Sequence, residues 1–302
     1  MRAAIGAHLG VEVLDIQKFG IEASGGSTPL LVTCRDPEGD RQLFAKLYTQ
    51  IHLRSDRWYK YGRTLLYGSL EDEVRWLSVK RLAEHEDYMM RLMRDADIPV
   101  PAPHGYITIT PEREYLIITD FLAGAHEIGD EPLTDGVVDQ ALETVRLMWD
   151  GSVAHRDIKP GNVMVSGDQV FLIDTAFGIA QPSAWREAVD LANMLLILGL
   201  HVDPEVVYAR ALRWFSPQDV AEAFAATRAI TIPTQLKGLL KAHEAETGVN
   251  LVQFYDDLTP PCEPISVQRW SARRIGLWLA TVLGVLILVS LVIDNVLGRG
   301  FL

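Results

Sequence analysis

The sequence predicts an α+β fold with a β-rich N-terminal lobe, a helical C-terminal lobe and one C-terminal transmembrane helix. Residues 11–48 alternate apolar and polar side chains between turn signals, which is typical of antiparallel strands. Residues 137–149 and 184–198 carry apolar side chains at helical spacing instead. Residues 275–293 are apolar and uncharged over about 28 Å of helix, close to the thickness of a hydrocarbon core.

Length and composition limit what the chain can be. With 302 residues, 48% of them hydrophobic, it can bury a sizeable core in one large domain or two lobes. The formal charge of −12 repels polyanions, which argues against nucleic acid as a partner. The two cysteines, Cys34 and Cys262, form no disulfide framework and fit a reducing compartment.

Short strands and one long helix make up the predicted N-terminal lobe. The strand segments are residues 11–19 (VEVLDIQKF), 28–34 (TPLLVTC), 41–48 (RQLFAKLY), 105–110 (GYITIT) and 114–124 (EYLIITDFLAG). DPEGD at residues 36–40 predicts a tight hairpin turn. Residues 70–96 show helical periodicity and end before the prolines of IPVPAP, which stop a helix.

The second half reads as helices interrupted by one hairpin. NVMV and QVFLID flank the turn residues SGD, so this hairpin delivers Asp174 shortly after Asn162. Residues 253–264 (QFYDDLTPPCEP) are the best linker before the apolar run. We therefore expect lobes at residues 1–122 and 123–260, a basic juxtamembrane linker at 261–274 and a transmembrane helix at 275–297.

The segment HRDIKPGN at residues 155–162 carries the chemistry. Phosphoryl transfer from ATP needs a carboxylate beside the attacking hydroxyl, oxygen ligands for a metal ion on the phosphates, and cations for the developing charge. Asp157 can accept the proton and Lys159 can neutralise the phosphate. Asn162 and Asp174 offer the hard oxygen ligands that Mg²⁺ prefers. The sequence thus predicts a site for ATP and Mg²⁺.

The motif His155-Arg156-Asp157-x-Lys159-x-x-Asn162, followed by Asp174, resembles the catalytic and metal-binding segments of the protein-kinase-like superfamily. The resemblance covers about residues 10 to 200. It implies that Lys46 holds the α- and β-phosphates of ATP from the third strand. It also implies a glutamate partner for Lys46 on the following helix. Glu86 fits the family pattern best, and Glu84 and Glu73 remain alternatives.

Two further segments resemble particular branches of that superfamily. The segment after Lys46, residues 45–68, is similar to the corresponding segment of RIO-type kinases. Residues 188–198 (AVDLANMLLIL) resemble the helix of RIO, aminoglycoside-phosphotransferase and lipopolysaccharide-kinase relatives. In those proteins its aspartate, here Asp190, braces the catalytic loop. The resemblance therefore favours a compact, atypical kinase.

The chain departs from the family pattern in three places. Ser24, Gly25, Gly26 and Ser27 stand where a glycine-rich phosphate loop is expected, and they fit either backbone contacts to phosphate or an ordinary hairpin turn. DTAFG replaces D-F-G, which keeps Asp174 and loses the phenylalanine switch. Residues 175–189 leave no room for a long peptide-binding segment. Lys159 is instead typical of serine/threonine kinases.

These observations predict a cytoplasmic, membrane-anchored kinase that transfers the γ-phosphate of ATP to a hydroxyl. The acceptor is a protein, or a lipid or sugar at the membrane, and the sequence does not choose among them. One alternative is a catalytically inactive kinase-like scaffold or regulatory subunit of a membrane complex, and another is transfer of AMP. Retention of Lys46, Asp157, Asn162 and Asp174 argues against the inactive scaffold.

The apolar run predicts how the chain sits in a membrane. Arg269, Arg273 and Arg274 precede it and Arg299 follows it, so the positive-inside rule places the kinase-like domain in the cytoplasm, at the cell inner (cytoplasmic) membrane, with a single pass. Small residues recur every four positions, at 276, 280 and 284, so the helix is either a lone anchor or packs against a membrane-protein partner. The basic residues within 52–63 fit either anionic headgroups or a solvated face.

Overall fold

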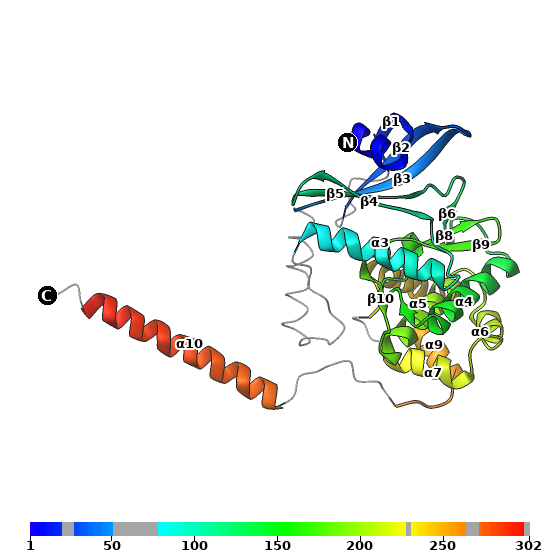
Figure 1. Ribbon diagram of the computed structural model, residues 1–302. Helices are drawn as coiled ribbons and strands as arrows, with labels where there is room; N and C mark the ends of the chain where they lie inside the picture. Colours follow the sequence, from blue (N-terminus) through cyan, green and yellow to red (C-terminus); the bar gives the residue numbers. More distant parts are fainter. Residues whose placement is uncertain (20–26, 51–77, 228–230, 264–271, 299–302) are drawn as a thin grey trace.

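The computed structural model describes residues 1–19, 27–50, 78–227, 231–263 and 272–298, and of helix α10 it describes the side chains of 275–293 (Figure 1). A sheet-rich N-terminal region lies on a helical C-terminal region, as the sequence predicts. Several predicted features fall outside the described residues: Ser24, Gly25, Gly26, the basic residues within 52–63, Glu73, Arg269 and Arg299.

The N-terminal region is built on a five-stranded antiparallel sheet with the order β1-β2-β3-β5-β4. Its strands are β1 (Glu12–Lys18), β2 (Thr28–Asp36), β3 (Gly39–Thr49), β4 (Pro103–Thr110) and β5 (Glu114–Asp120). The predicted turn between β2 and β3 is closed by Asp36, whose carboxylate accepts a hydrogen bond of 2.8 Å from the backbone N–H of Glu38. β3 pairs with both β2 and β5, so it lies at the centre of the sheet.

A short N-terminal helix, α1 (Arg2–Leu9), was not expected from the sequence. It packs against β1 and β4, and its Ile5 is fully buried among Val32, Leu43 and Leu116. A helix this short is not stable in isolation, so its formation depends on packing against the sheet. Sequence periodicity alone therefore carries little signal for it.

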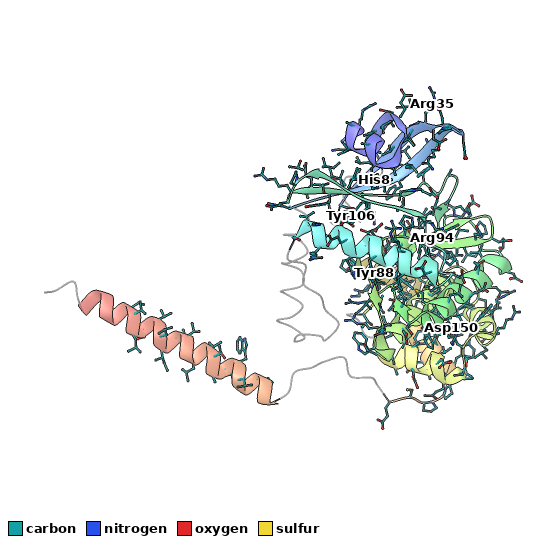
Figure 2. The ribbon with its side chains drawn as sticks, viewed as in Figure 1. His8, Arg35, Tyr88, Arg94, Tyr106 and Asp150 are labelled. Atoms are coloured by element: carbon teal, nitrogen blue, oxygen red, sulfur yellow. The ribbon has the colours of Figure 1, made fainter. Side chains whose placement is uncertain are left out.

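The long helix α3 (Val79–Asp95) connects the cores of both regions. Its N-cap is Ser78, whose hydroxyl accepts a hydrogen bond from the backbone N–H of Arg81 at 3.3 Å. Buried residues of α3 pack beneath the sheet, and Met89 and Met93 belong to the core of the helical region. Tyr88 and Arg94 project from its exposed side (Figure 2). The described helix begins at residue 79, and residues 70–77 of the predicted helix lie outside the described part.

The helical region is organised around α5, which is buried along most of its length. Its helices are α4 (Asp135–Asp150), α5 (Ala184–Gly199), α6 (Pro204–Ala211), α7 (Pro217–Ala226), α8 (Thr234–Thr247) and α9 (Leu251–Leu258). Helices from several sides cover α5. A helix covered all round needs no polar stripe, which explains the apolar run MLLILG that ends it.

The linker predicted at residues 253–264 begins too early, because α9 occupies its first half. Tyr255 is fully buried, and its ring stacks on Phe224 with 4.9 Å between the ring centroids. The Tyr255 hydroxyl also donates a hydrogen bond of 3.3 Å to the carbonyl of Leu195 in α5. The acidic pair and prolines that follow Tyr255 are typical of a linker, but the aromatic residue belongs to the core.

Short strands frame the loop that contains the HRDIKPGN motif. A three-stranded sheet is formed by β6 (His126–Glu127), β8 (Val163–Ser166) and β9 (Gln169–Leu172), and a two-stranded one by β7 (Val153–Ala154) and β10 (Ile179–Ala180). Two short 3-10 turns, η1 (Pro160–Asn162) and η2 (Thr175–Phe177), complete the frame. The hairpin predicted before Asp174 is therefore present as β8 and β9.

Helix α10 (Ala272–Gly298) contains the apolar run. Residues Ile275–Ile293 have a mean hydropathy of 2.6, and none of this segment is buried. By length and composition, α10 is the one helix in the described part of the chain that can cross a membrane.

Candidate functional site

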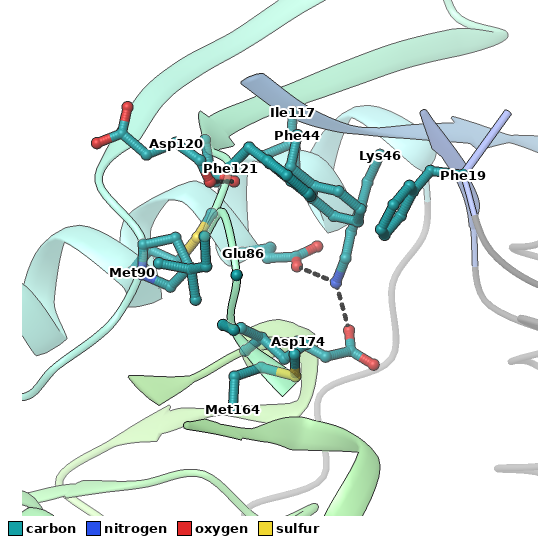
Figure 3. A pocket seen from close by; sticks show the side chains of 16 residues that line it. Phe19, Phe44, Lys46, Glu86, Met90, Ile117, Asp120, Phe121, Met164 and Asp174 are labelled. Atoms are coloured by element: carbon teal, nitrogen blue, oxygen red, sulfur yellow. Dashed lines mark hydrogen bonds and ion pairs between the residues drawn. The ribbon is translucent and has the colours of Figure 1, made fainter. Parts of the chain in front are cut away.

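Three charged side chains from three distant parts of the chain meet beneath the sheet (Figure 3). The ammonium of Lys46, on β3, lies 2.9 Å from Oε1 of Glu86 on α3. The same nitrogen lies 2.7 Å from Oδ1 of Asp174, which follows β9. One cation is thus shared by two carboxylates; Lys46 and Glu86 are largely shielded from solvent, and 35% of the Asp174 side chain is exposed.

The charges of this group stabilise one another. Burial alone would lower the pKa of Lys46, but the carboxylates of Asp174 and Glu86 outweigh it and raise that pKa. Burial opposes ionisation of Asp174, but Lys46 overcomes it and lowers the pKa of Asp174. The stability gained from Asp174 is therefore present above about pH 4 and is lost as the pH falls through this lowered pKa.

The structure distinguishes Glu86 from Glu84, and Glu73 lies outside the described residues. Glu86 points inward, with 2% of its side chain exposed. Glu84 instead accepts hydrogen bonds from Tyr106 at 3.0 Å and from Arg81 at 2.8 Å, away from Lys46. Two residues turn an α-helix by about 200°, so Glu86 lies on the buried face of α3 and Glu84 on the opposite side.

Tyr48 is a polar member of this group that sequence reasoning missed. It is 2% exposed, and its hydroxyl donates a short hydrogen bond to Oε2 of Glu86. Burial and the neighbouring Glu86 carboxylate raise the pKa of Tyr48 well above its usual range, so the phenol stays protonated. The sequence does carry one indication of this contact. Tyr48 lies two residues after Lys46, and alternate residues of a strand share one face of the sheet.

The HRDIKPGN segment gathers its polar groups around Asp157. Lys159 donates a hydrogen bond of 2.6 Å to Oδ2 of Asp157, and the Asn162 amide donates one of 3.0 Å to the same oxygen. Asn162 also donates to the backbone carbonyl of Asp157 at 2.8 Å. Both donors use Oδ2, which leaves Oδ1 of Asp157 to receive a proton. The Asn162 amide points its nitrogen toward Asp157, which leaves its oxygen for another ligand.

Asp190 of α5 holds this loop from below. Its fully buried carboxylate accepts hydrogen bonds from the backbone N–H groups of His155, at 2.6 Å, and Arg156, at 3.0 Å. Arg156 has a left-handed backbone with φ of 69°, which a non-glycine residue adopts only where contacts support it. Burial raises the pKa of Asp190, and the charge of His155 and these two amides oppose the shift. The bracing role implied by the family resemblance matches these contacts.

Replacing Asp190 by alanine is expected to lower the free energy of unfolding by about 2–4 kcal/mol, because two buried N–H groups lose their acceptor. Urea denaturation of the purified chain measures the change. Asp190→Asn keeps one acceptor oxygen and is expected to lose less. Equal stability of wild type and Asp190→Ala would mean that burying the carboxylate costs as much as its hydrogen bonds contribute.

Backbone and imidazole contacts tie the loop to the strand that carries Asp174. The buried His155 ring donates from Nε2 to the carbonyl of Ile173 at 3.0 Å. The N–H of Ile173 in turn donates to the carbonyl of Asn162 at 3.0 Å. Asn162 and Asp174 are therefore held in neighbouring backbone positions, as a shared metal site requires.

The DTAFG segment after β9 is fastened to α3. Asp174 has a left-handed backbone with φ of 62°. The hydroxyl of Thr175 donates to the carbonyl of Glu86 at 3.4 Å, and the His85 ring bonds the carbonyl of Gly178 at 2.9 Å. Thr175 replaces the phenylalanine that follows the aspartate in the D-F-G pattern. Its hydroxyl links the residue after Asp174 to the helix that bears Glu86.

A cleft lies between the two regions, and the charged group is part of its lining (Figure 3). It contains about 780 Å³ of empty space, part of it open to solvent. Its walls are mostly apolar, and its charged lining residues are Lys46, Glu86, Asp120 and Asp174. The apolar lining comprises Phe19, Phe44, Met90, Ile117, Phe121, Leu122, Met164 and Ile173. The cleft therefore suits a ligand with an aromatic base and an anionic tail.

The donor set fits a magnesium ion better than a transition metal. The free amide oxygen of Asn162 and the Asp174 carboxylate are hard oxygen ligands, which Mg²⁺ prefers together with phosphate oxygens. In the described part of the chain, no group of three or more His, Cys, Asp or Glu side chains could hold a metal by itself. Ser27, the described member of the predicted phosphate loop, is buried next to the start of β2.

Comparison with known proteins agrees with a kinase-like assignment. No family model matches the chain. The serine/threonine-protein kinase PknA of Corynebacterium glutamicum is 23% identical over 184 residues, which are 60% of this chain and 36% of PknA. The chain thus spans about a third of the length of this curated relative.

A solved structure, that of a Neurospora crassa PAN3 pseudokinase mutant, aligns over 95% of this chain and 69% of the other, with a TM-score of 0.38 and 9% identity. The chain is thus distantly similar to a protein kinase, and its described residues form a β-rich N-terminal region and a helical C-terminal region.

Proposed function

We propose that this protein is an ATP-dependent phosphotransferase that moves the γ-phosphate of MgATP to a hydroxyl group. The observation that carries the proposal is a pair of polar groups that the backbone bond between Ile173 and Asn162 holds side by side, and the first of them lines the cleft. Lys46, Glu86 and Asp174 form the first group, and Asp157 with its two donors forms the second. These are the charges that phosphoryl transfer from ATP requires.

Each residue has a defined task in this reaction. The apolar walls of the cleft bind the base of ATP, and Lys46 attracts its α- and β-phosphates. Asn162 and Asp174 would hold Mg²⁺, which neutralises phosphate charge when it is bound. Oδ1 of Asp157 accepts the proton of the acceptor hydroxyl. The oxygen of that hydroxyl forms a bond to the γ-phosphorus while the bond from the γ-phosphorus to ADP breaks and ADP leaves. Lys159 stabilises the charge on the transferring phosphoryl group.

The backbone after Asp174 supports an atypical kinase of the RIO or aminoglycoside-phosphotransferase kind. Residues 175–183 connect Asp174 directly to α5, and β10 within them pairs with β7. This short, paired segment offers no extended cradle for a peptide. The acceptor hydroxyl therefore belongs to a folded protein or to a lipid or sugar at the membrane.

We place the kinase-like domain, with lobes at residues 1–122 and 123–260, on the cytoplasmic side of the inner membrane. The linker at 261–274 leads to α10, whose exposed apolar residues need lipid or a protein partner. Tethering raises the effective concentration of any acceptor at the bilayer surface. The membrane attachment thereby supports a membrane-associated acceptor.

A chain that ends at Glu263 is expected to remain soluble and to stay unbound when mixed with phospholipid vesicles, whereas the full chain floats with them. The reason is that the truncated chain lacks the exposed apolar residues of Ile275–Ile293. Vesicle flotation measures this difference. Full chain carrying Leu286→Arg serves as the control, because a central arginine costs about 2.5–3.5 kcal/mol on insertion. Flotation of the truncated chain would assign membrane binding to another surface.

The decisive experiment is phosphoryl transfer from γ-labelled ATP in magnesium, by the full chain mixed with membranes and cytosol of its source. Label in a protein, lipid or sugar fraction with wild type, and none with Asp157→Ala, would establish a kinase and its acceptor class. Label transferred from α-labelled ATP would indicate AMP transfer instead. No label from either form, with a folded protein, would make the chain a kinase-like scaffold.

A further inference from the structure

We infer that Tyr48 is a positioning residue for the triphosphate of ATP, acting through Glu86; this inference rests on the proposed function. Tyr48 and Lys46 lie on the same face of β3 and reach the same carboxylate. Lys46 contacts Oε1 of Glu86, and Tyr48 donates to Oε2. Each oxygen of Glu86 therefore has its own donor from one strand.

The two donors restrict the position of Glu86 in a way that one donor does not. A carboxylate held by a single flexible lysine can rotate about its terminal bond, whereas contacts on both oxygens prevent this rotation. The backbone of Glu86 is also engaged, because its carbonyl accepts the hydroxyl of Thr175. Glu86 is thus held by its carboxylate and by its backbone carbonyl, and it in turn holds Lys46 in the lining of the cleft.

The balance of charge explains why a neutral second donor is needed. Glu86 and Asp174 share the single positive charge of Lys46. When Lys46 turns toward a phosphate, Glu86 keeps less of that charge while its side chain stays buried. A tyrosine hydroxyl continues to donate a hydrogen bond to Glu86. Because it is neutral, it attracts the phosphate less than the ammonium of Lys46 does. Tyr48 therefore allows Lys46 to bind phosphate without leaving a buried carboxylate unpaired.

The test is nucleotide binding by the full chain in detergent, measured by calorimetry. Tyr48→Phe is expected to weaken MgATP binding about ten- to a hundredfold, because a hydrogen bond to a charged group is lost. Adenosine has no phosphates, so its affinity is expected to stay the same. A purely structural role of Tyr48 would weaken both ligands alike, and that result would overturn the inference.

Tyr115→Phe is the matched control. Tyr115 lies directly opposite Tyr48 in the sheet and is 4% exposed, but its hydroxyl accepts from the backbone N–H of Glu112 at 3.2 Å. This variant loses the same group from the same layer and is expected to bind MgATP like wild type. Equal weakening by both variants would also contradict the inference.

A double-mutant cycle tests the route through Glu86. If Tyr48 acts through this carboxylate, Tyr48→Phe is expected to add little to the effect of Glu86→Gln. Full additivity would mean that Tyr48 acts elsewhere. Wild-type chain that binds no MgATP would refute the proposed function itself, whereas normal wild-type binding with unaffected Tyr48→Phe would refute this inference alone.

A second substitution covers the case in which Tyr48→Phe does not fold. Incorporation of 3,5-difluorotyrosine at position 48 keeps the ring and the hydroxyl but makes the phenol more acidic. The more acidic hydroxyl still donates to Oε2 of Glu86, so this protein is expected to bind MgATP at least as tightly as wild type. A loss of MgATP affinity with the hydroxyl in place would overturn the inference.

Discussion

Asp157→Asn is expected to slow phosphoryl transfer by about 10²–10⁴-fold while MgATP binding is retained. Asp157 accepts hydrogen bonds from Lys159 and Asn162 on Oδ2. In the proposed reaction its Oδ1 receives the proton of the acceptor hydroxyl. Asparagine has the same size but cannot take up the proton. The rate of label transfer from γ-labelled ATP at saturating ATP measures the loss, and calorimetry measures binding.

Asp256→Asn is the control for this substitution, because Asp256 is an exposed aspartate of α9 outside the cleft. Its rate is expected to equal that of wild type. An undiminished transfer rate of Asp157→Asn would show that Asp157 does not take part in the reaction. A loss of rate accompanied by a lower melting temperature would assign the effect to folding.

Asp174→Asn is expected to reduce transfer by about 10²–10³-fold and to weaken its dependence on magnesium. The substitution removes the ion pair with Lys46, which measures 2.7 Å, and one anionic oxygen of the predicted metal site. It is not expected to unfold the domain, because asparagine is among the residues that best tolerate the left-handed backbone at this position. A magnesium titration of the transfer rate tests both effects.

Asp97→Asn provides a matched control. Asp97 is also an aspartate with a left-handed backbone, φ of 58°, but it is exposed in the turn after α3. Its substitution is expected to leave rate and magnesium dependence unchanged. If Asp174→Asn kept full activity at every magnesium concentration, Asp174 would not be a metal ligand.

The residues of the site that the sequence predicted are those whose relation is local. Asp157, Lys159 and Asn162 lie within one short loop, so their spacing alone brings them together. The hairpin of β8 and β9 is likewise a local structure, and it carries Asp174 to that loop. The choice of Glu86 came from a resemblance, and helical spacing agrees with it, because Glu86 shares a face with Leu82 and Met89 and Glu84 does not.

The features that sequence reasoning missed depend on contacts between distant segments. The role of Tyr48 requires α3 to lie across β3, and alternation within a strand does not show which helix covers it. α1 is stabilised because Ile5 packs into the core of the sheet. α9 is stabilised because Tyr255 packs against α5. In each case tertiary packing decides a structure that local propensity leaves undecided.

The short segment after Asp174 has a consequence for the time course of the reaction. It is held from both sides, by His85 at Gly178 and by the pairing of Ile179 and Ala180 with β7. These contacts already order the segment, so the proposed phosphotransferase is expected to need no rearrangement of it before the first turnover. Progress curves recorded from the moment of mixing should therefore rise at their full initial slope without a lag. The rate of the proposed reaction would then depend on the concentrations of ATP and acceptor and not on a slow activation step.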